Sequence, residues 1–137
     1  MEWLKIPTST ELVRVRTDEI VGVVADGNYS DLYLYDGRKH KLTFKLHYFD
    51  EAFDRLKYNP FVRIGRSLII NKQYVYVVNL TERKCILAGQ PIKGEFKFDA
   101  PRVALESLKK YMETDNPDDK PNFENLPFTD DEKGGSI

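Results

Sequence analysis

Two Asp-Gly dipeptides, at residues 26–27 and 36–37, constrain the fold of this chain more than any other feature of its sequence. Asp-Gly is a preferred dipeptide in the tight turns that join antiparallel strands. A β-branched run, residues 20–25, precedes the first dipeptide, residues 29–35 alternate between the two, and residues 40–44 follow the second. Such runs, bounded by turn residues, predict short strands joined by tight turns.

Strand-like runs continue through the rest of the chain, with two interruptions. Residues 46–56 place their apolar side chains at the spacing of one helix face, and Pro60 limits that helix because the residue before proline avoids the helical region. A second amphipathic helix is predicted at about residues 101–112. The fold class is therefore predicted to be mostly β, with one central and one C-terminal helix. The other predicted strands are residues 2–6, 11–16, 61–64, 68–70, 74–80 and 83–88.

The charged residues are divided unevenly along the 137 residues. Residues 113–137 hold eight acids and two lysines, a net charge of −6, so the rest of the chain, whose total is −1, carries +5. We expect one domain at residues 1–112, followed by an acidic, flexible tail at 113–137. The basic charge of the domain permits binding to DNA but does not establish it.

Several classes of function have no support in the sequence. Cys85 is the only cysteine, so an internal disulfide is impossible and a cysteine-rich metal site is not expected. The two histidines, His40 and His47, lack zinc-site spacing, and no glycine-rich phosphate loop is present. No apolar run is long enough to cross a membrane, and residues 1–5 do not resemble a signal peptide. We therefore expect a cytoplasmic protein that is not an enzyme and has no cofactor, metal or small-molecule substrate.

Residues 61–75 contain the pattern that is most informative about function. Arg63 and Arg66 are three positions apart, Ser67 follows, and apolar residues on both sides can anchor the segment. An arginine side chain can bind phosphate or the guanine edge with two parallel hydrogen bonds, while hydroxyl and backbone N–H groups bind phosphates. The alternative is a surface loop whose arginines pair with acidic residues.

Residues 61–71 resemble the signature of the LytTR family of DNA-binding domains, roughly Phe-x-Arg-Ile-His-Arg-Ser-x-x-Val-Asn. Residues 18–29 and 43–46 are similar to the hairpin and the pre-helix segment of that family, and the resemblance covers about residues 12–112. It implies a mostly β fold with elongated strands, in which loops enter successive major grooves and bend the duplex. Family members regulate bacterial transcription, often as dimers on paired direct repeats.

The resemblance also implies roles for individual residues. In the family, the polar residue directly before the serine reads bases, and Arg66 occupies that position. Asn71 has an alternative role, as the cap of the turn before Lys72. The residues implied in the hairpin that approaches a groove are Asn28, Tyr29 and Ser30, and those implied as phosphate or supporting contacts are Lys45, Arg63, Ser67 and Asn71.

Two departures from the family pattern affect the predicted interface. Gly65 replaces the usual histidine, which removes one side chain from the recognition loop. Residues 93–102 stand where the family has a short loop before its last helix, and they are predicted to form a longer loop. The cation that this loop would present to DNA is Lys93, Lys97 or Arg102, and the sequence gives no basis for choosing among them. Phe96 and Phe98 are expected in the core.

The predicted function is sequence-specific binding of double-stranded DNA in transcriptional regulation. The alternative is a protein-interaction module of the same fold with weakened DNA readout, and a small β-rich enzyme is a remote third interpretation. About eleven residues precede the first matched strand, so we expect no receiver domain. The implied partners are double-stranded DNA and a second copy of the chain on direct repeats. One hypothesis is that the acidic tail competes with DNA, and an inert tail is the alternative.

Overall fold

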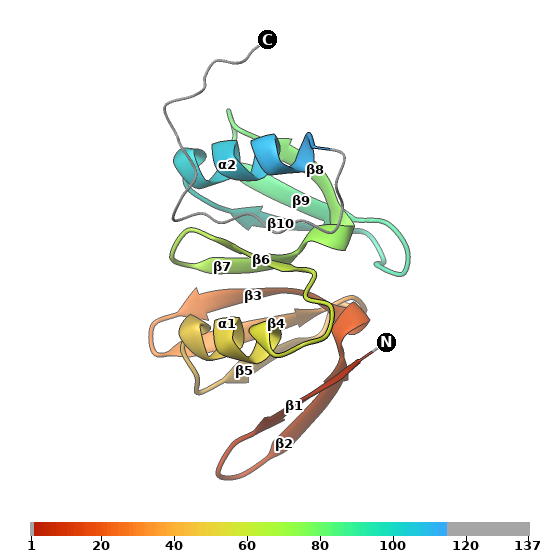
Figure 1. Ribbon diagram of the computed structural model, residues 1–137, viewed down its shortest axis with the longest axis vertical. Helices are drawn as coiled ribbons and strands as arrows, with labels where there is room; N and C mark the ends of the chain where they lie inside the picture. Colours follow the sequence, from red (N-terminus) through yellow and green to blue (C-terminus); the bar gives the residue numbers. More distant parts are fainter. Residues whose placement is uncertain (1, 115–137) are drawn as a thin grey trace.

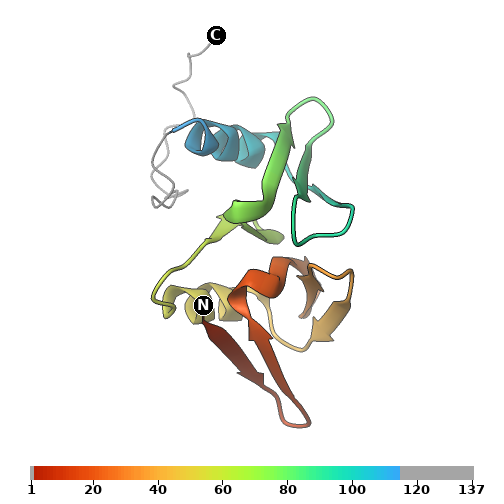
Figure 2. The same cartoon turned by 90° about the vertical axis from the view of Figure 1, so that its right-hand side faces the viewer.

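Three antiparallel sheets follow one another along the length of the molecule in the computed structural model, which describes residues 2–114 (Figure 1). Figure 2 shows the same order from the side, with the β1–β2 hairpin at the lower end and α2 at the upper end. The first sheet is β1 (Trp3–Pro7) and β2 (Leu12–Arg16); the central one has the order β5-β4-β3-β7-β6; the third is β10-β9-β8.

The remaining elements have the following bounds. The central sheet contains β3 (Ile20–Asp26), β4 (Tyr29–Leu34), β5 (Lys39–Leu42), β6 (Phe61–Ile64) and β7 (Leu68–Asn71). The third sheet contains β8 (Val75–Asn79), β9 (Lys84–Ala88) and β10 (Glu95–Asp99). The helices are α1 (Leu46–Asp54) and α2 (Arg102–Met112), with short 3₁₀ turns η1 (Thr17–Glu19) and η2 (Lys72–Tyr74).

Strand β3 lies in the middle of the central sheet and pairs with β4 on one side and β7 on the other. The β3–β4 pairing runs to Asp26 opposite Tyr29, which leaves a two-residue turn. Gly27 in this turn has a φ of 62°, a left-handed conformation that glycine adopts without steric cost. The first predicted Asp-Gly hairpin is therefore confirmed.

The central sheet separates two apolar clusters, because successive side chains of a strand point to opposite faces. In β7, Ile69 faces the cluster that contains α1, whereas Leu68 and Ile70 face the cluster beneath α2. Phe49 and Phe53 of α1 are essentially inaccessible to solvent in the first cluster, as is Leu105 of α2 in the second. Each helix thus contributes buried side chains to the cluster on one face of the sheet.

The predicted mostly β fold with a central and a C-terminal helix is confirmed. Helix α1 ends at Asp54, two residues before the predicted end of its apolar pattern, although Leu56 still packs against the same cluster. The prediction of a long loop over residues 93–102 is wrong, because residues 95–99 form β10 and pair with β9. Phe98 is buried, as predicted, and Phe96 packs against the same cluster.

The predicted division of the chain at residue 112 stays a prediction, since residues 115–137 lie outside the described part. Within residues 2–114, neither helix has the length and apolar character needed to cross a membrane.

Candidate nucleic-acid interface

Three connecting segments meet at one end of the central sheet. They are the β3–β4 turn, residues 43–45 before α1, and the β6–β7 turn at residues 65–67, all on the left-hand side of Figure 1. The backbone N–H of Ala25 donates to the carbonyl of Ser67 at 2.8 Å, and the Ser30 hydroxyl donates to the carbonyl of Phe44 at 2.7 Å. These two hydrogen bonds join segments that are far apart in sequence into one surface.

Most of the predicted contact residues on these segments are exposed. Arg66 and Ser67 lie in the β6–β7 turn, Lys45 precedes the first residue of α1, and Asn28 follows Gly27. Within residues 2–114, the side chains of Arg66 and Lys45 have no hydrogen bond or ion pair. These two exposed cations lie on segments that meet at the same end of the central sheet.

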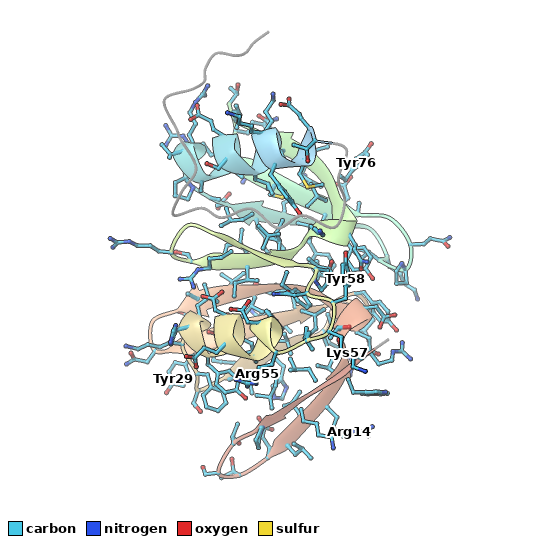
Figure 3. The ribbon with its side chains drawn as sticks, in the orientation of Figure 1. Arg14, Tyr29, Arg55, Lys57, Tyr58 and Tyr76 are labelled. Atoms are coloured by element: carbon cyan, nitrogen blue, oxygen red, sulfur yellow. The ribbon has the colours of Figure 1, made fainter. Side chains whose placement is uncertain are left out.

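Tyr29 is 45% exposed and lies beside an internally neutralised lysine at the same end (Figure 3). Its ring is 5.7 Å from the Nζ atom of Lys41, and that ammonium pairs with Asp26 at 2.7 Å and Asp31 at 3.0 Å. Hydrogen bonds to Asp26 and Asp31 raise the pKa of Lys41, and the bond from Lys41 lowers the pKa of Asp26. Lys41 therefore lies beside the Tyr29 ring without adding a free positive charge, because its one ammonium is shared by two carboxylates.

Two of the predicted contact residues are buried. Ser30 is fully covered and its hydroxyl is engaged with Phe44. Asn71 is also fully covered: its Nδ2 donates to the carbonyl of Ile20 at 3.0 Å, and its Oδ1 accepts from the N–H of Gln73 at 3.0 Å. The cap role foreseen for Asn71 is the one the structure shows. Ser30 lies beneath this surface, whereas Asn71 lies at the opposite end of β7, next to the start of β3, so neither side chain reaches a ligand on the surface.

Arg63 is also committed to the protein, with a side chain that is 33% exposed. Its Nε donates to the carbonyl of Gly65 at 2.9 Å, its Nη2 donates to the carbonyl of Arg66 at 3.2 Å, and its Nη1 pairs with Asp50 of α1. Burial raises the pKa of Asp50, and the attraction of Arg63 opposes that rise. Among residues 2–114, the alternative of an arginine paired with an acidic residue therefore holds for Arg63 and not for Arg66.

The three candidates for a further cation have different positions. Arg102 begins α2 beside the β6–β7 turn, because a Cβ on Gly65 would lie 3.7 Å from Pro101 and from Ala104. Its guanidinium is half exposed and pairs with Glu106 at 3.3 Å, a surface contact that contributes about 0–1 kcal/mol. Lys97 is in the middle of β10, and Lys93 is in the loop on the opposite, right-hand side of Figure 1. Of these three residues, Arg102 is the one whose chain neighbours, Pro101 and Ala104, lie beside the turn that carries Arg66.

The sequence did not reveal the roles of Lys41 and Asp50. The signal for Lys41 was present in the hairpin register, which places Lys41 opposite Asp31. No local signal pointed to Asp50, because its partner Arg63 is 13 residues away on a different element.

Among residues 2–114, no group of three histidine, cysteine, aspartate or glutamate side chains is placed to hold a metal ion. Burial raises the pKa of Cys85 to about 12, so its thiol stays protonated and unreactive at neutral pH.

Comparison with known proteins agrees with this picture. Residues 10–113 match the sequence model of the LytTr DNA-binding domain. The structure is similar to the LytTr DNA-binding domain of a methyl-accepting/DNA response regulator from Bacillus cereus, with a TM-score of 0.57 and 13% sequence identity. The similarity covers 83% of this chain and 99% of that domain. No curated protein has a sequence that matches the chain.

Proposed function

The chain belongs to the LytTR family of DNA-binding domains, and we propose that it regulates transcription by reading a specific double-stranded sequence with the turns at one end of its central sheet. The observation that carries this proposal is the exposed guanidinium of Arg66, which has no hydrogen bond or ion pair within residues 2–114. It lies on a turn that the β3–β7 pairing holds beside the β3–β4 turn. An arginine held on a rigid support can make the bidentate contact to guanine O6 and N7, which is the commonest specific contact in the major groove.

The other exposed side chains fit complementary roles in the same complex. Lys45 and the hydroxyl of Ser67 suit phosphate contacts, which fix the position of a protein on the duplex but carry no sequence information. Asn28 suits adenine, whose N6 and N7 match a side-chain amide, and Tyr29 adds an exposed ring beside it. Arg102, which pairs with Glu106 at the start of α2 beside the β6–β7 turn, is proposed as a further cation toward the duplex.

We place this activity in the cytoplasm, and we propose that two copies bind paired direct repeats, as the LytTR resemblance implies. Direct repeats orient two domains in the same direction along the duplex. The proposal therefore predicts that a duplex with two half-sites binds two copies, and that a duplex with one half-site binds one. Analytical ultracentrifugation of the complexes measures this stoichiometry.

The deciding experiment measures binding to random duplexes and to duplexes enriched by selection, across a series of salt concentrations. A regulator has a steep negative slope of log affinity against log salt, because phosphate contacts release counterions, and it binds a selected sequence far more tightly than random DNA. Absence of any binding at micromolar protein would overturn the proposal and favour a protein-interaction module. Equal affinity for all sequences would remove the specific readout and leave general DNA binding.

A further inference from the structure

The guanidinium of Arg63 braces the β6–β7 turn from inside. All three of its nitrogens are engaged, with the carbonyl of Gly65, the carbonyl of Arg66 and the carboxylate of Asp50. A guanidinium is planar and its N–H donors point in fixed directions. Three simultaneous bonds to it therefore fix the positions of its three partners relative to one another.

These hydrogen bonds fix the two peptide units on either side of Arg66. The carbonyls of Gly65 and Arg66 both point at the guanidinium. In a trans peptide the N–H points opposite to the carbonyl, so the N–H groups of Arg66 and Ser67 point away from Arg63. Gly65, with a φ of 67°, makes the left-handed step that allows this arrangement. The direction in which the Arg66 side chain leaves the turn is set by the same two peptides.

Asp50 connects this brace to a rigid element. It lies on α1, whose Phe49 and Phe53 are buried against the central sheet. Lys45 directly precedes that helix, so α1 carries one exposed cation of the interface at its start and the anchor of the turn in its middle. The turn and the helix are therefore held together at the Asp50–Arg63 pair, whose side chains are only 32% and 33% exposed.

We infer that Arg63 is a positioning residue that acts with Asp50 to hold residues 65–67 in one conformation, so that Arg66 is presented to DNA while Arg63 itself does not touch it. This inference rests on the proposed function. A direct contact between Arg63 and a phosphate is the competing role, and it requires the guanidinium to give up partners that it already has.

Asp50→Asn distinguishes a brace from a purely electrostatic effect of Asp50, because the two predict changes in affinity of opposite sign. Removing a negative charge near DNA should tighten binding to every sequence if electrostatics alone operates. The brace predicts the opposite for the selected sequence: a loss of about tenfold or more in the ratio of selected to random affinity, within the range of coupling between residues in contact. Glu51→Gln is the matched control, because it removes the same charge one residue away, where the Glu51 carboxylate pairs with His47. It should leave the ratio unchanged.

Arg63→Gln tests for the phosphate contact through salt dependence. A positioning role leaves the slope of log affinity against log salt as in the wild type while the selected-to-random ratio falls. A phosphate contact lowers the magnitude of the slope by about 0.9. A changed slope with an intact ratio would overturn the inference, as would an intact ratio in Asp50→Asn. Circular dichroism and thermal unfolding check that each variant is folded.

A measurement without DNA keeps the inference separate from the proposed function. Backbone ¹⁵N relaxation of the free protein reports the order of the Arg66 and Ser67 amides. We expect order parameters of about 0.85 in the wild type and Glu51→Gln, and below about 0.6 in Asp50→Asn or Arg63→Gln. An equally ordered turn in both variants would refute the brace even if the wild type bound no DNA. A mobile turn in a protein without DNA binding would refute only the proposed function.

Discussion

The backbone N–H of Ala25 lies 2.8 Å from the carbonyl oxygen of Ser67, and this hydrogen bond extends the β3–β7 ladder to the end of the sheet. It places the β3–β4 turn beside the β6–β7 turn, although the two turns are separated by α1, β5 and a long stretch of sequence. The proposed interface is thus a product of strand pairing. Its exposed side chains act together only because the sheet aligns the turns that carry them.

Arg66→Ala is expected to remove sequence preference at one position of the target. The side chain is exposed and has no partner within the described residues, so the free energy of unfolding should change by less than about 0.5 kcal/mol. The affinity for the selected duplex should fall by about 1–3 kcal/mol, the usual contribution of a bidentate base contact. Titration of selected and base-substituted duplexes measures both effects.

Lys57→Ala is the matched control for that variant. Lys57 is an exposed cation in the segment after α1, on the right-hand side of Figure 3, whereas the proposed interface is on the left. Its loss should leave the sequence preference as it is. If both variants lowered affinity equally on all duplexes, Arg66 would be acting only through its charge.

Lys45→Ala is expected to weaken binding to every duplex by the same factor. Lys45 is exposed at the start of α1 and has no internal partner among residues 2–114. Loss of one phosphate contact should reduce the magnitude of the salt slope by about 0.9 without changing the ranking of sequences. A change in the ranking would instead show that Lys45 takes part in base readout.

The sequence predicted the fold well wherever local patterns decide the structure. The Asp26-Gly27 turn, the spacing in residues 46–56 and the apolar strands all act over a few residues, and each produced the expected element. The missed strand, β10, also has a local signal, since Phe96 and Phe98 face inward between exposed Glu95, Lys97 and Asp99. The family pattern led to the expectation of a long loop in this segment, so the alternation was not interpreted as a strand.

The candidate site was predicted less completely, because exposure and pairing depend on distant partners. Nothing near Ser30 in sequence shows that Phe44 will cover its hydroxyl, and nothing near Arg63 shows that Asp50 will engage its guanidinium. The family resemblance implied base reading by Arg66 and a phosphate or supporting contact by Arg63, without showing which partners either side chain has. Within residues 2–114, the Arg66 side chain has no partner, whereas the guanidinium of Arg63 is bonded to the carbonyls of Gly65 and Arg66.

Asn71→Ala is expected to destabilise the protein without altering DNA recognition directly. The substitution leaves the buried carbonyl of Ile20 and the N–H of Gln73 without their partner, a loss of about 1–3 kcal/mol in the free energy of unfolding. Chemical denaturation measures this change. The folded fraction should keep the wild-type ratio of selected to random affinity.

Asn28→Ala is expected to alter DNA recognition without destabilising the protein, the opposite of Asn71→Ala, since Asn28 is exposed in the β3–β4 turn. Its stability should stay within about 0.5 kcal/mol of the wild type, while its preference among duplexes changes. If Asn71→Ala altered the preference and Asn28→Ala did not, the roles given to the two side chains would have to be exchanged.

Gly65→Ala is expected to lower stability through backbone strain. An added Cβ would have ordinary contacts of 3.7 Å with Pro101 and Ala104, so space is available. The φ of 67° is the difficulty, because a left-handed residue other than glycine costs about 1–2 kcal/mol. Gly65→Asn should cost less, since asparagine tolerates this conformation better. Denaturation curves for both variants test the order, and an alanine variant as stable as the wild type would contradict it.

Deletion of residues 114–137 is expected to tighten DNA binding at low salt. This segment, of which residues 115–137 lie outside the described residues, holds seven acids and two lysines, so its removal changes the net charge of the chain from −1 to +4. Repulsion between the acidic segment and phosphates acts over about 30 Å at 0.01 M salt and about 8 Å at 0.15 M, so the gain should shrink as salt rises. A length-matched variant with the seven acids replaced by Asn and Gln separates charge from bulk, and it should bind at least as tightly as the deletion. Equal affinity for the full chain and the deletion at every salt concentration would show that the acidic segment is inert toward DNA.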